Sequence, residues 1–287
     1  MQISIEKNKN YLVTGGSGFL GKKLIERIHS EGGNVITIAR DEGKLIQLQQ
    51  ELPYVNIHTG DISDRFDLEQ VVKWADGIFH LAAFKHVGIA EKQSRECIKS
   101  NTIGSMNLLE LGVEYQVEFN IGISTDKAAI VSGVYGASKF LMEALYRQFE
   151  STYESTQFRI VRYGNVLYST GSVLCKWKDL LQSGKQVIVT EPEATRFFWT
   201  IDQAVDLIFD CMENAVDSQP YVPDMKSMKV GDLLQAMIKK YSPDGYTADV
   251  KTIGLQPGEN LHEKILAGGL SSEEAERFSV EEIMELI

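Results

Sequence analysis

Short apolar runs alternate with longer segments of helical periodicity through the first half of the chain. We expect strands at 11–14, 35–39, 55–58, 78–83, 117–124 and 158–163, and helices at 20–29, 44–50, 68–74, 89–111 and 134–149. Strands that alternate with helices in this way form βαβ units, in which helices cover both faces of a parallel sheet. The pattern therefore predicts a doubly wound, Rossmann-type α/β core over residues 1–163.

The pattern loosens after Gly164, where glycines and prolines mark turns between short elements. We expect residues 164–287 to form mainly a smaller, substrate-binding lobe. The apolar spacing at 203–212 indicates a helix that returns to the core. The acidic end, residues 272–287, has an amphipathic helical pattern and is expected to be a helix with a solvated face.

Composition narrows the functional classes. The 287 residues are 43% hydrophobic and 24% charged, which is typical of a folded globular protein. No apolar stretch approaches the roughly 18 residues of a membrane span, and residues 1–10 lack the apolar core of a signal peptide, so we expect a cytoplasmic protein. A net charge of −11 argues against binding to nucleic acid or to anionic lipid. Three scattered cysteines and five histidines form no metal-ligand pattern, so no metal is expected.

A glycine-rich loop follows the first expected strand. Thr14-Gly15-Gly16-Ser17-Gly18-Phe19-Leu20-Gly21 satisfies both the GxGxxG and the GxxGxxG spacing. Glycine is needed where the backbone turns tightly and approaches a pyrophosphate, and the free N–H groups at the start of the next helix favour an anion. The sequence predicts a dinucleotide site that is contacted by Gly15, Ser17, Gly18, Phe19, Leu20 and Gly21.

The end of the second strand bears on which cofactor is bound. Asp41 has the spacing of a carboxylate that holds the ribose 2′-hydroxyl of NAD, whereas Arg40 could pair with the 2′-phosphate of NADP. The two interpretations conflict, because a carboxylate would repel that phosphate. We favour NADP, with Arg40 as its partner and Lys44 in support. Asp61 and Ile62, after the third strand, are expected to contact the adenine, unless they form only a surface turn.

Tyr135 and Lys139 lie four residues apart on an expected helix and therefore share one face. A free tyrosine has a pKa of about 10, so a base that works near neutral pH needs this pKa lowered by about 3 units. We expect the Lys139 ammonium one turn away, with the positive nicotinamide ring nearby, to supply charge of the right sign. The phenolate could then take the proton of a sugar hydroxyl as hydride leaves the same carbon for the cofactor.

Ser124-Thr125-Asp126-Lys127-Ala128 comes at the end of the fifth expected strand. Together with the glycine loop and the Tyr135–Lys139 pair, this segment resembles the extended short-chain dehydrogenase/reductase superfamily. The Asp-Lys dipeptide is similar to the UDP-N-acetylglucosamine 4,6-dehydratase branch, which includes the inverting dehydratase of pseudaminic acid synthesis and capsule polysaccharide dehydratases.

The resemblance implies a set of roles. Thr125, Tyr135 and Lys139 belong to the catalytic group. Ser124, Tyr135 and Lys139 contact the cofactor. Asp126 is the acid that protonates the departing 6-hydroxyl, and Lys127 is the base that removes the C5 proton. Hydride returns from NADPH to C6, so that the tightly bound cofactor is regenerated in each turnover.

Other segments resemble the same branch. The stretch around His80-Leu-Ala-Ala-Phe-Lys85 implies cofactor contacts by Leu81, Ala82, Ala83 and Lys85, and Asn101 matches the asparagine of a helix near the active site. Contacts to the substrate are implied for Lys85, Asn165, Val166, Ser172, Val173, Arg196, Gln256 and Glu259. Among these, Arg196 is the leading candidate for binding a diphosphate, since a guanidinium can meet it in bidentate fashion.

The chain departs from the family pattern near its end. In Leu255-Gln-Pro-Gly-Glu-Asn-Leu-His-Glu263, Gln256 and Asn260 replace an arginine and a lysine of the family motif, so two cations are lost near the expected diphosphate. The segment 130–133, before Tyr135, also differs from the family. His86 and His262 are interpreted as structural, because the Asp-Lys-Tyr scheme needs neither.

We expect a UDP-sugar substrate and the 4,6-dehydratase reaction, with the outcome at C5, retained or inverted, left open. An NADP-dependent nucleotide-sugar 4-epimerase or 4-reductase is the alternative, and it would not require Asp126 and Lys127. A catalytically silent NADP-binding regulatory protein is a third possibility, against which the intact Thr125, Tyr135 and Lys139 argue. By resemblance the chain should form a homo-oligomer, a dimer or a hexamer, to which residues 89–111 could contribute an interface.

Overall fold

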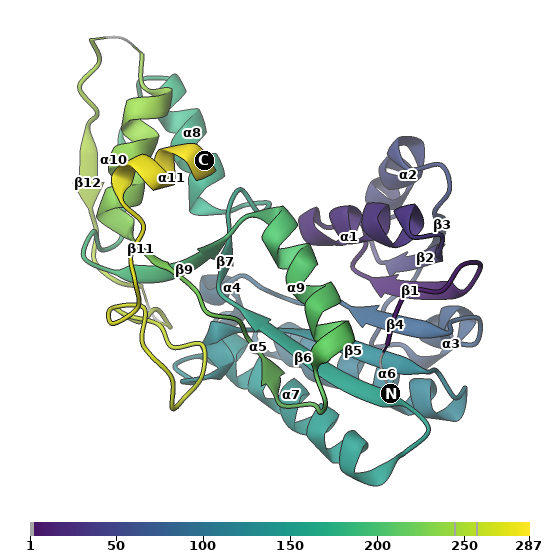
Figure 1. The fold of residues 1–287 in the computed structure, drawn as a ribbon. Coiled ribbons are helices and arrows are strands. Elements are labelled where there is room, and N and C mark those ends of the chain that lie inside the picture. The colour runs from purple at the N-terminus through teal and green to yellow at the C-terminus, as the bar shows by residue number, and fades with distance from the viewer. Residues whose placement is uncertain (1–2, 244, 257) are drawn as a thin grey trace.

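A computed structural model describes residues 3–243, 245–256 and 258–287, so Pro257 of the C-terminal motif lies outside the described residues. A parallel sheet of seven strands, in the order β10-β6-β5-β4-β1-β2-β3, forms its centre (Figure 1). The strands are β1 (Asn10–Thr14), β2 (Asn34–Ala39), β3 (Asn56–Thr59), β4 (Gly77–His80), β5 (Phe119–Thr125), β6 (Gln157–Tyr163) and β10 (Pro220–Tyr221). The predicted doubly wound α/β class is confirmed.

Helices cover both faces of this sheet because successive strand residues point to opposite sides. Leu12 and Ile78 pack with α3 (Arg65–Val72) and α6 (Gly104–Glu114), while α7 (Val134–Thr152) packs on β6. Tyr11 and Phe79 face the other side, toward α1 (Phe19–Ser30), α2 (Glu42–Glu51) and α9 (Ile201–Asn214). The strand ends that carry the site residues are therefore held between two packed layers.

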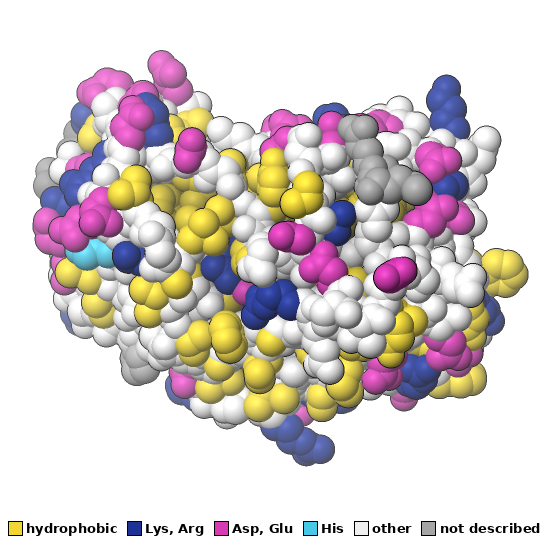
Figure 2. All heavy atoms as spheres, turned by 60° about the horizontal axis from the view of Figure 1, so that its bottom comes forward, with side chains coloured by type: hydrophobic (Ala, Val, Ile, Leu, Met, Phe, Trp, Pro, Cys, Tyr) yellow, Lys and Arg dark blue, Asp and Glu magenta, His cyan; other side chains and the backbone are white. Residues whose placement is uncertain are grey.

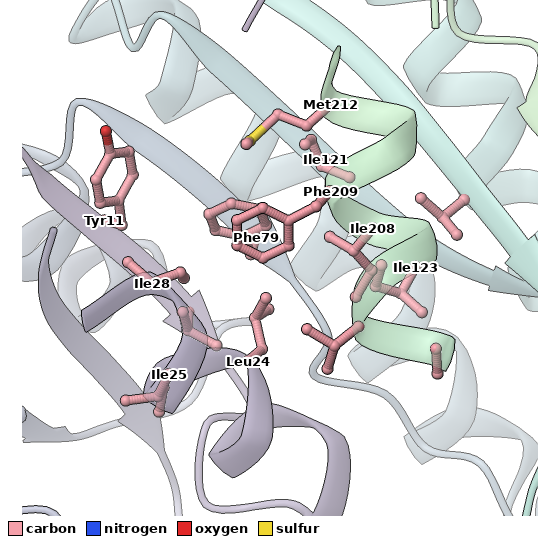
Figure 3. Packing of buried hydrophobic residues seen from close by; sticks show 14 of the residues in the cluster. Tyr11, Leu24, Ile25, Ile28, Phe79, Ile121, Ile123, Ile208, Phe209 and Met212 are labelled. Atoms are coloured by element: carbon pink, nitrogen blue, oxygen red, sulfur yellow. The ribbon is translucent and has the colours of Figure 1, made fainter. Parts of the chain in front are cut away.

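Helix α9 comes from the second half of the chain but packs beside α1. Figure 3 shows Leu24 and Ile28 of α1 close to Ile208 and Phe209 of α9, above Phe79 of the sheet. These side chains are at most 5% exposed. A capping box at Thr200 and Gln203 starts α9 by satisfying two otherwise free N–H groups.

A second apolar cluster lies in the C-terminal half of the chain, where α8 (Val173–Gln182), α10 (Val230–Tyr241) and α11 (Val280–Leu286) pack around Trp177 and Met228. Two small sheets accompany it. One has the order β11-β9-β7, with β11 (Ser227–Lys229), β9 (Thr195–Trp199) and β7 (Asn165–Val166). The other pairs β12 (Val250–Thr252) with β8 (Val187–Val189).

The long helix predicted at 89–111 is not continuous. The chain forms α4 (Val87–Ala90), α5 (Ser94–Ile98), the π-helical η1 (Lys99–Ile103) and then α6. Asn101 lies in the π-helical turn, where its buried side chain bonds to the Phe84 backbone and to Ser138. The spacing of apolar residues does not predict a π-helical turn of this kind, because the turn accommodates the contacts of a polar side chain.

The predicted helix at 272–287 was too long. Only α11 is helical, and it begins after Ser279 in a capping box with Glu282. Ser227 of β11 bonds through its own N–H to the carbonyl of Glu276 and through its carbonyl to the N–H of Phe278. These backbone groups are therefore not free for a helix. Across the described residues, no helix is long and apolar enough to cross a membrane.

Candidate active site

The glycine loop lies between β1 and α1. Gly15 has a φ of +74°, and a Cβ there would come within 2.9 Å of the Ala82 nitrogen. A Cβ on Gly21 would come within 2.4 Å of the Gly15 carbonyl oxygen, so the first turn of α1 lies directly on the loop. Helix α1 begins at Phe19, directly after Ser17 and Gly18, and no side chain caps it. Its first N–H groups include those of Phe19 and Leu20. The loop has the shape and the free donors that an anion at a helix N-terminus requires.

The two residues that bear on cofactor choice differ in their contacts. Asp41 is the N-cap of α2, where its carboxylate accepts a hydrogen bond from the Lys44 nitrogen at 3.0 Å and lies 3.5 Å from Lys44 Nζ. This bond and the Lys44 charge lower the pKa of Asp41. Arg40 is exposed at the end of β2 and, among the described residues, has no hydrogen-bonded or ion-paired partner. The carboxylate is thus committed to the helix, whereas the guanidinium is available.

Asp61 and Ile62 follow β3. Asp61 accepts hydrogen bonds from the nitrogen and hydroxyl of Ser63 and from Lys99 Nζ. Burial acts to raise its pKa, but these bonds outweigh burial, and the pKa of Asp61 is lowered. Ile62 is buried against Gly104 of α6. Both residues lie at the same edge of the sheet as the glycine loop, because parallel strands place their carboxyl ends together.

Residues 81–85 pass beside the glycine loop. The nitrogens of Leu81 and Ala82 bond to the carbonyl and the hydroxyl of Thr14, and the chain continues through Ala83. Asn101 holds the next residue, Phe84, by both its N–H and its carbonyl. Lys85 is exposed, and its Nζ donates to the Thr170 carbonyl at 3.2 Å.

A buried histidine supports this arrangement. His80, at the end of β4, bonds to the hydroxyls of Thr14 and Ser105, both at 2.8 Å. Burial lowers its pKa to about 3, so the ring stays neutral and structural at physiological pH. His262 bonds to Thr195, and exposed His86 lies near Gly171.

Thr125, Asp126 and Lys127 come where β5 ends and η2 (Asp126–Ala128) begins. Asp126 is 1% exposed, and its Oδ1 accepts from Thr125 Oγ1 at 2.9 Å and from Lys127 Nζ at 3.0 Å. The Lys127 side chain is 17% exposed. Burial alone would lower the pKa of this lysine, but Asp126 and Glu263 raise it. The acid and the base expected from the sequence are therefore in direct contact, as an ion pair.

Tyr135 and Lys139 lie on the first turns of α7, half-buried and buried respectively. Lys139 Nζ donates to the Ile123 carbonyl at 2.7 Å, and burial lowers the pKa of Lys139 to about 8. For Tyr135, burial raises the pKa, against the opposing influence of Lys127 and the Thr125 hydroxyl. The protein alone does not produce the lowered tyrosine pKa that we expected, since burial outweighs the nearby charge, and the cation acting on the phenol is Lys127 rather than Lys139.

The side chain of Ser124 faces away from the hydroxyl of Thr125. Its Oγ donates at 2.5 Å to Glu143, a carboxylate on α7 that is 1% exposed. Glu143 also accepts two hydrogen bonds from Arg162 of β6. The side chain of Ser124 therefore joins a buried polar network beneath the site, which leaves only its backbone for a cofactor.

Arg196, on β9, is bound to the C-terminal segment. Its Nη1 donates to the carbonyls of Thr195 and Leu261, and its Nη2 to that of Asn260, at 2.7–2.9 Å. Its Nε lies 3.9 Å from Glu263 Oε1, and the Arg196 side chain is 12% exposed. Most of the guanidinium thus holds residues 260–261, which is a different contact from the diphosphate expected from the sequence.

The remaining candidates for substrate binding are spread over three segments. Asn165 and Val166 form β7, where Asn165 donates to the Phe197 carbonyl. Ser172 precedes α8 and Val173 begins it, 40% exposed. Gln256 and Glu259 bond to each other through the Gln256 nitrogen and a Glu259 carboxylate oxygen, at 2.9 Å. This hydrogen bond occupies a carboxylate oxygen of Glu259 that we had expected to bind the substrate.

Three polar residues of the site had no role in the sequence analysis: Glu263, Glu143 and Glu91. Glu263 is 2% exposed beside Lys127, and it ends the C-terminal motif, which was the only signal for it. Glu143 could have been found, because it lies one helical turn after Lys139 on the same face. Glu91 accepts a hydrogen bond from the Val134 nitrogen at 2.7 Å and so caps α7, which carries Tyr135 and Lys139. In the described part of the chain, no group of three His, Cys, Asp or Glu side chains is placed to hold a metal ion.

Comparison with known proteins agrees with this geometry. A family model described as polysaccharide biosynthesis protein matches residues 11–286. The chain is 32% identical to an inverting UDP-N-acetylglucosamine 4,6-dehydratase of Campylobacter jejuni, over 90% of this chain and 78% of that protein. It is 29% identical to a UDP-glucose 4-epimerase of Rickettsia canadensis, over 91% of this chain and 78% of that one.

Among solved structures, the chain is similar to Pen from Bacillus thuringiensis, with a TM-score of 0.92 and 26% identity, over 99% of both chains. Extended Rossmann neighbours of lower identity share the fold. The family match spans nearly the whole chain, and it includes the glycine loop, the Asp126–Lys127 pair and the Tyr135–Lys139 pair. This chain therefore belongs to the polysaccharide biosynthesis protein family, within the extended short-chain dehydrogenase/reductase superfamily.

Proposed function

We propose that the chain is an NADP-dependent UDP-N-acetylglucosamine 4,6-dehydratase that makes a UDP-4-keto-6-deoxy-N-acetylhexosamine. The observation that carries the proposal is the buried contact between Asp126 and Lys127, next to the Thr125 hydroxyl and the N-terminus of α7. Oxidation at C4 alone requires a tyrosine and a lysine, whereas elimination of water across C5 and C6 requires an additional acid and base. The similarity to the Campylobacter jejuni dehydratase supports the same reaction.

The residues present fit a dinucleotide. Gly15, Gly18 and Gly21 let the loop turn tightly against α1, and the uncapped N–H groups at the start of α1 would bind a pyrophosphate, while exposed Arg40 would pair with a 2′-phosphate. Asp41 favours this assignment because its carboxylate is occupied as the cap of α2. When bound, the nicotinamide cofactor supplies the chemistry of accepting a hydride from C4 and returning one to C6.

The residues of the chain move three protons in this scheme. Tyr135, which must be a phenolate when the reaction starts, takes the proton of the 4-hydroxyl. Lys127 takes the C5 proton, and Asp126 gives a proton to the 6-hydroxyl, which leaves as water. Lys127 later returns its proton to C5. Each turnover therefore leaves one extra proton on Tyr135 and one too few on Asp126. The Thr125 hydroxyl donates to Asp126 at 2.9 Å and also interacts with the Tyr135 phenol, so it is suited to pass that proton back.

The ion pair itself must change before elimination. A Lys127 ammonium cannot accept the C5 proton, and an Asp126 carboxylate cannot protonate the 6-hydroxyl. Transfer of one proton across the 3.0 Å contact converts both groups to the forms that the reaction needs. A substrate that excludes water favours this neutral pair, because separated charges cost more free energy in a low-dielectric site.

Binding of the UDP-sugar is assigned to the segments around the pair. Lys85 provides an exposed cation, and Arg196 has an Nη2 hydrogen and its Nε–H left for a phosphate oxygen. Asn165, Ser172 and Glu259 are the polar candidates for the sugar and ribose hydroxyls. We further propose that the protein works in the cytoplasm as a homo-oligomer.

Proton NMR of the purified protein with UDP-N-acetylglucosamine and NADP in deuterated water tests the reaction. A new C6 methyl signal with deuterium at C5 is expected, and its coupling constants report whether C5 is retained or inverted. Signals of an exocyclic methylene would mean elimination without hydride return to C6. Unchanged substrate in the presence of bound cofactor would contradict the proposal for this sugar.

One variant distinguishes a dehydratase from a 4-epimerase or 4-reductase. This alternative is tested because the chain is similar to the Rickettsia canadensis epimerase. Lys127→Ala should abolish methyl formation and C5 exchange in a dehydratase, by roughly 100-fold or more, but should leave an epimerase little affected. Lys73→Ala, at the exposed end of α3, is the matched control and should behave as wild type.

A further inference from the structure

Glu263 is a buried carboxylate for which the proposed proton transfers give no role. It is 2% exposed, and its Oε1 lies 3.8 Å from Lys127 Nζ and 3.9 Å from Arg196 Nε. Its Oε2 accepts a hydrogen bond from Asn260 at 3.2 Å. Among the described residues, Oε1 has no hydrogen-bond partner. Burying a carboxylate oxygen without a hydrogen bond costs folding free energy, so its position between two cations calls for a functional explanation.

Lys127 therefore has two carboxylates around it. Asp126 contacts it from the same turn of η2, and Glu263 faces it from the C-terminal segment, 136 positions later in the chain. Asp126 also has one buried oxygen, Oδ2, without a hydrogen-bond partner in the described residues. Two anions next to one ammonium favour the protonated lysine, and thereby oppose the neutral form that would accept a proton.

The C-terminal segment that carries Glu263 is fixed at several points. Arg196 holds the carbonyls of Asn260 and Leu261, and the Glu263 nitrogen donates to Ser272 Oγ at 2.9 Å. Arg162 donates to the carbonyl of Ile265 at 2.6 Å. The backbone around Glu263 is thus held by side chains of β9 and β6 and by Ser272.

We propose that Glu263 is a positioning residue for Lys127, which holds the lysine Nζ against Asp126 and controls how tightly the lysine keeps its proton. The inference rests on the proposed dehydration for its consequence in catalysis. An ionised Glu263 keeps the Lys127–Asp126 pair charged. When Glu263 takes up a proton, the transfer from Lys127 to Asp126 becomes easier, because the second anion no longer stabilises the ammonium.

The groups that face Glu263 set when this happens. Lys127 and Asp126 face it from η2, Arg196 from β9 and Asn260 from its own segment, while His262 points to Thr195 and Glu273 instead. Burial and the Asp126 charge raise the pKa of Glu263, and the two cations oppose them. Protonation of Glu263 therefore occurs at a higher pH than for an ordinary glutamate.

The test uses Glu263→Gln, which keeps the shape and an acceptor for Asn260 but removes the charge. The titration of Lys127 is followed by NMR of lysine labelled with 13C at Cε, with Lys127→Ala identifying the signal. The dependence of C5 deuterium exchange on pH is measured in parallel. Both the Lys127 titration and the rise of exchange with pH should move to lower pH by about 1 unit. Glu263→Asp keeps the charge, so it should lower the exchange rate without moving its pH dependence.

The outcomes separate the two proposals. If Glu263→Gln lowers the rate but leaves both titrations in place, Glu263 is only structural and the inference is wrong. If wild type makes no product but the Lys127 titration still moves, the charge coupling stands and the proposed dehydration fails. Glu276→Gln, an exposed acid paired with Lys226, is the control and should change nothing. Should Glu263→Gln not fold, the wild-type Lys127 signal decides, because it must show an inflection as Glu263 titrates, at a higher pH than an ordinary glutamate. A Lys127 signal without that inflection would contradict the inference.

Discussion

Arg162 on β6 and Glu143 on α7 form a two-pronged ion pair in the interior, with N–O distances of 3.0 and 2.5 Å. Their side chains are 6% and 1% exposed. Glu143 also accepts from Ser124 at the end of β5, and Arg162 donates to the Ile265 carbonyl. This pair thus joins β5, which precedes Asp126 and Lys127, to α7 and to the C-terminal segment that carries Glu263.

Removing one partner of this pair should destabilise the protein strongly. Arg162→Met leaves Glu143 buried without its hydrogen-bonded cation, with Arg147 still 3.7 Å away, so we expect the free energy of unfolding to fall by about 3–5 kcal/mol. Denaturant unfolding monitored by circular dichroism measures it. The double variant Glu143→Leu/Arg162→Met should recover much of the loss. Arg65→Met is the control, because the carboxylates that pair with Arg65 are exposed, and it should lower the free energy of unfolding by less than about 1 kcal/mol. An equal decrease in Arg162→Met and Arg65→Met would contradict the prediction.

Lys139 should make stability depend on pH in the alkaline range. Its pKa is about 8 in the folded protein against 10.5 in the unfolded chain, so the unfolded state binds more protons between these values. By linkage, stability then rises with pH in that window, and the cost of burying the ammonium is largest below pH 8. Between pH 7 and 9.5 this one group should add about 2 kcal/mol to the free energy of unfolding.

Lys139→Met isolates that contribution. The variant should lack the alkaline gain, so its stability relative to wild type should be about 2 kcal/mol better at pH 7 than at pH 9.5. The Ile123 carbonyl loses its donor in the variant, which lowers its stability at both pH values but does not change the difference. Parallel curves for the two proteins would mean that the Lys139 pKa is not lowered.

Arg40 should decide between the two dinucleotides. Arg40→Ala removes the exposed guanidinium expected to meet a 2′-phosphate, so NADP binding should weaken by about 10- to 100-fold while NAD binding stays nearly constant. Isothermal titration of both cofactors against the purified protein measures it. Arg65→Ala is the matched surface control. A preference of wild type for NAD, unchanged in Arg40→Ala, would instead mean that Asp41 leaves its capping position to bind the ribose.

The sheet could be predicted from the sequence because parallel strands are buried on both faces and read as short apolar runs. Leu12 and Val13 of β1 and Ile78 and Phe79 of β4 are wholly buried, and each lies in an expected strand. The interruption at Lys99–Ile103 could not be predicted, since it exists to bring Asn101 to the Phe84 backbone, which is a tertiary contact.

Those site residues that are near one another in sequence could be found by the same reasoning. Asp126 and Lys127 are adjacent, and Tyr135 and Lys139 share a helical face. Glu263 was not accessible, because its place beside Lys127 depends on how Arg196 and Arg162 hold the C-terminal segment. The raised pKa of Tyr135 was missed for a related reason: the sequence displays the neighbouring charges but not the burial that opposes them.

The face of α7 that points away from the sheet carries exposed apolar side chains, which we expect to pack in the proposed homo-oligomer. Phe140 and Leu141 on α7 are 45% and 46% exposed, and Ile103 and Met106 on the adjoining η1 and α6 are 41% and 36% exposed. Figure 2, turned so that the side with α7 in Figure 1 comes forward, shows hydrophobic side chains gathered in its lower middle. Contiguous exposed apolar side chains of this kind are typical of protein interfaces.

Charge placed on this face should dissociate the proposed oligomer. Phe140→Glu/Leu141→Glu is expected to run at the monomer mass in size-exclusion chromatography with light scattering, whereas wild type runs at the mass of a dimer or larger. Phe66→Glu is the matched control, because Phe66 is 71% exposed on α3, which contacts α6 and is separated by it from α7. If wild type is a monomer, or if the α7 variant keeps the wild-type mass, this face is not the interface. The same helix, α7, carries Tyr135 and Lys139. A monomeric variant that binds the cofactor normally but turns over more slowly would therefore show that assembly stabilises the position of α7.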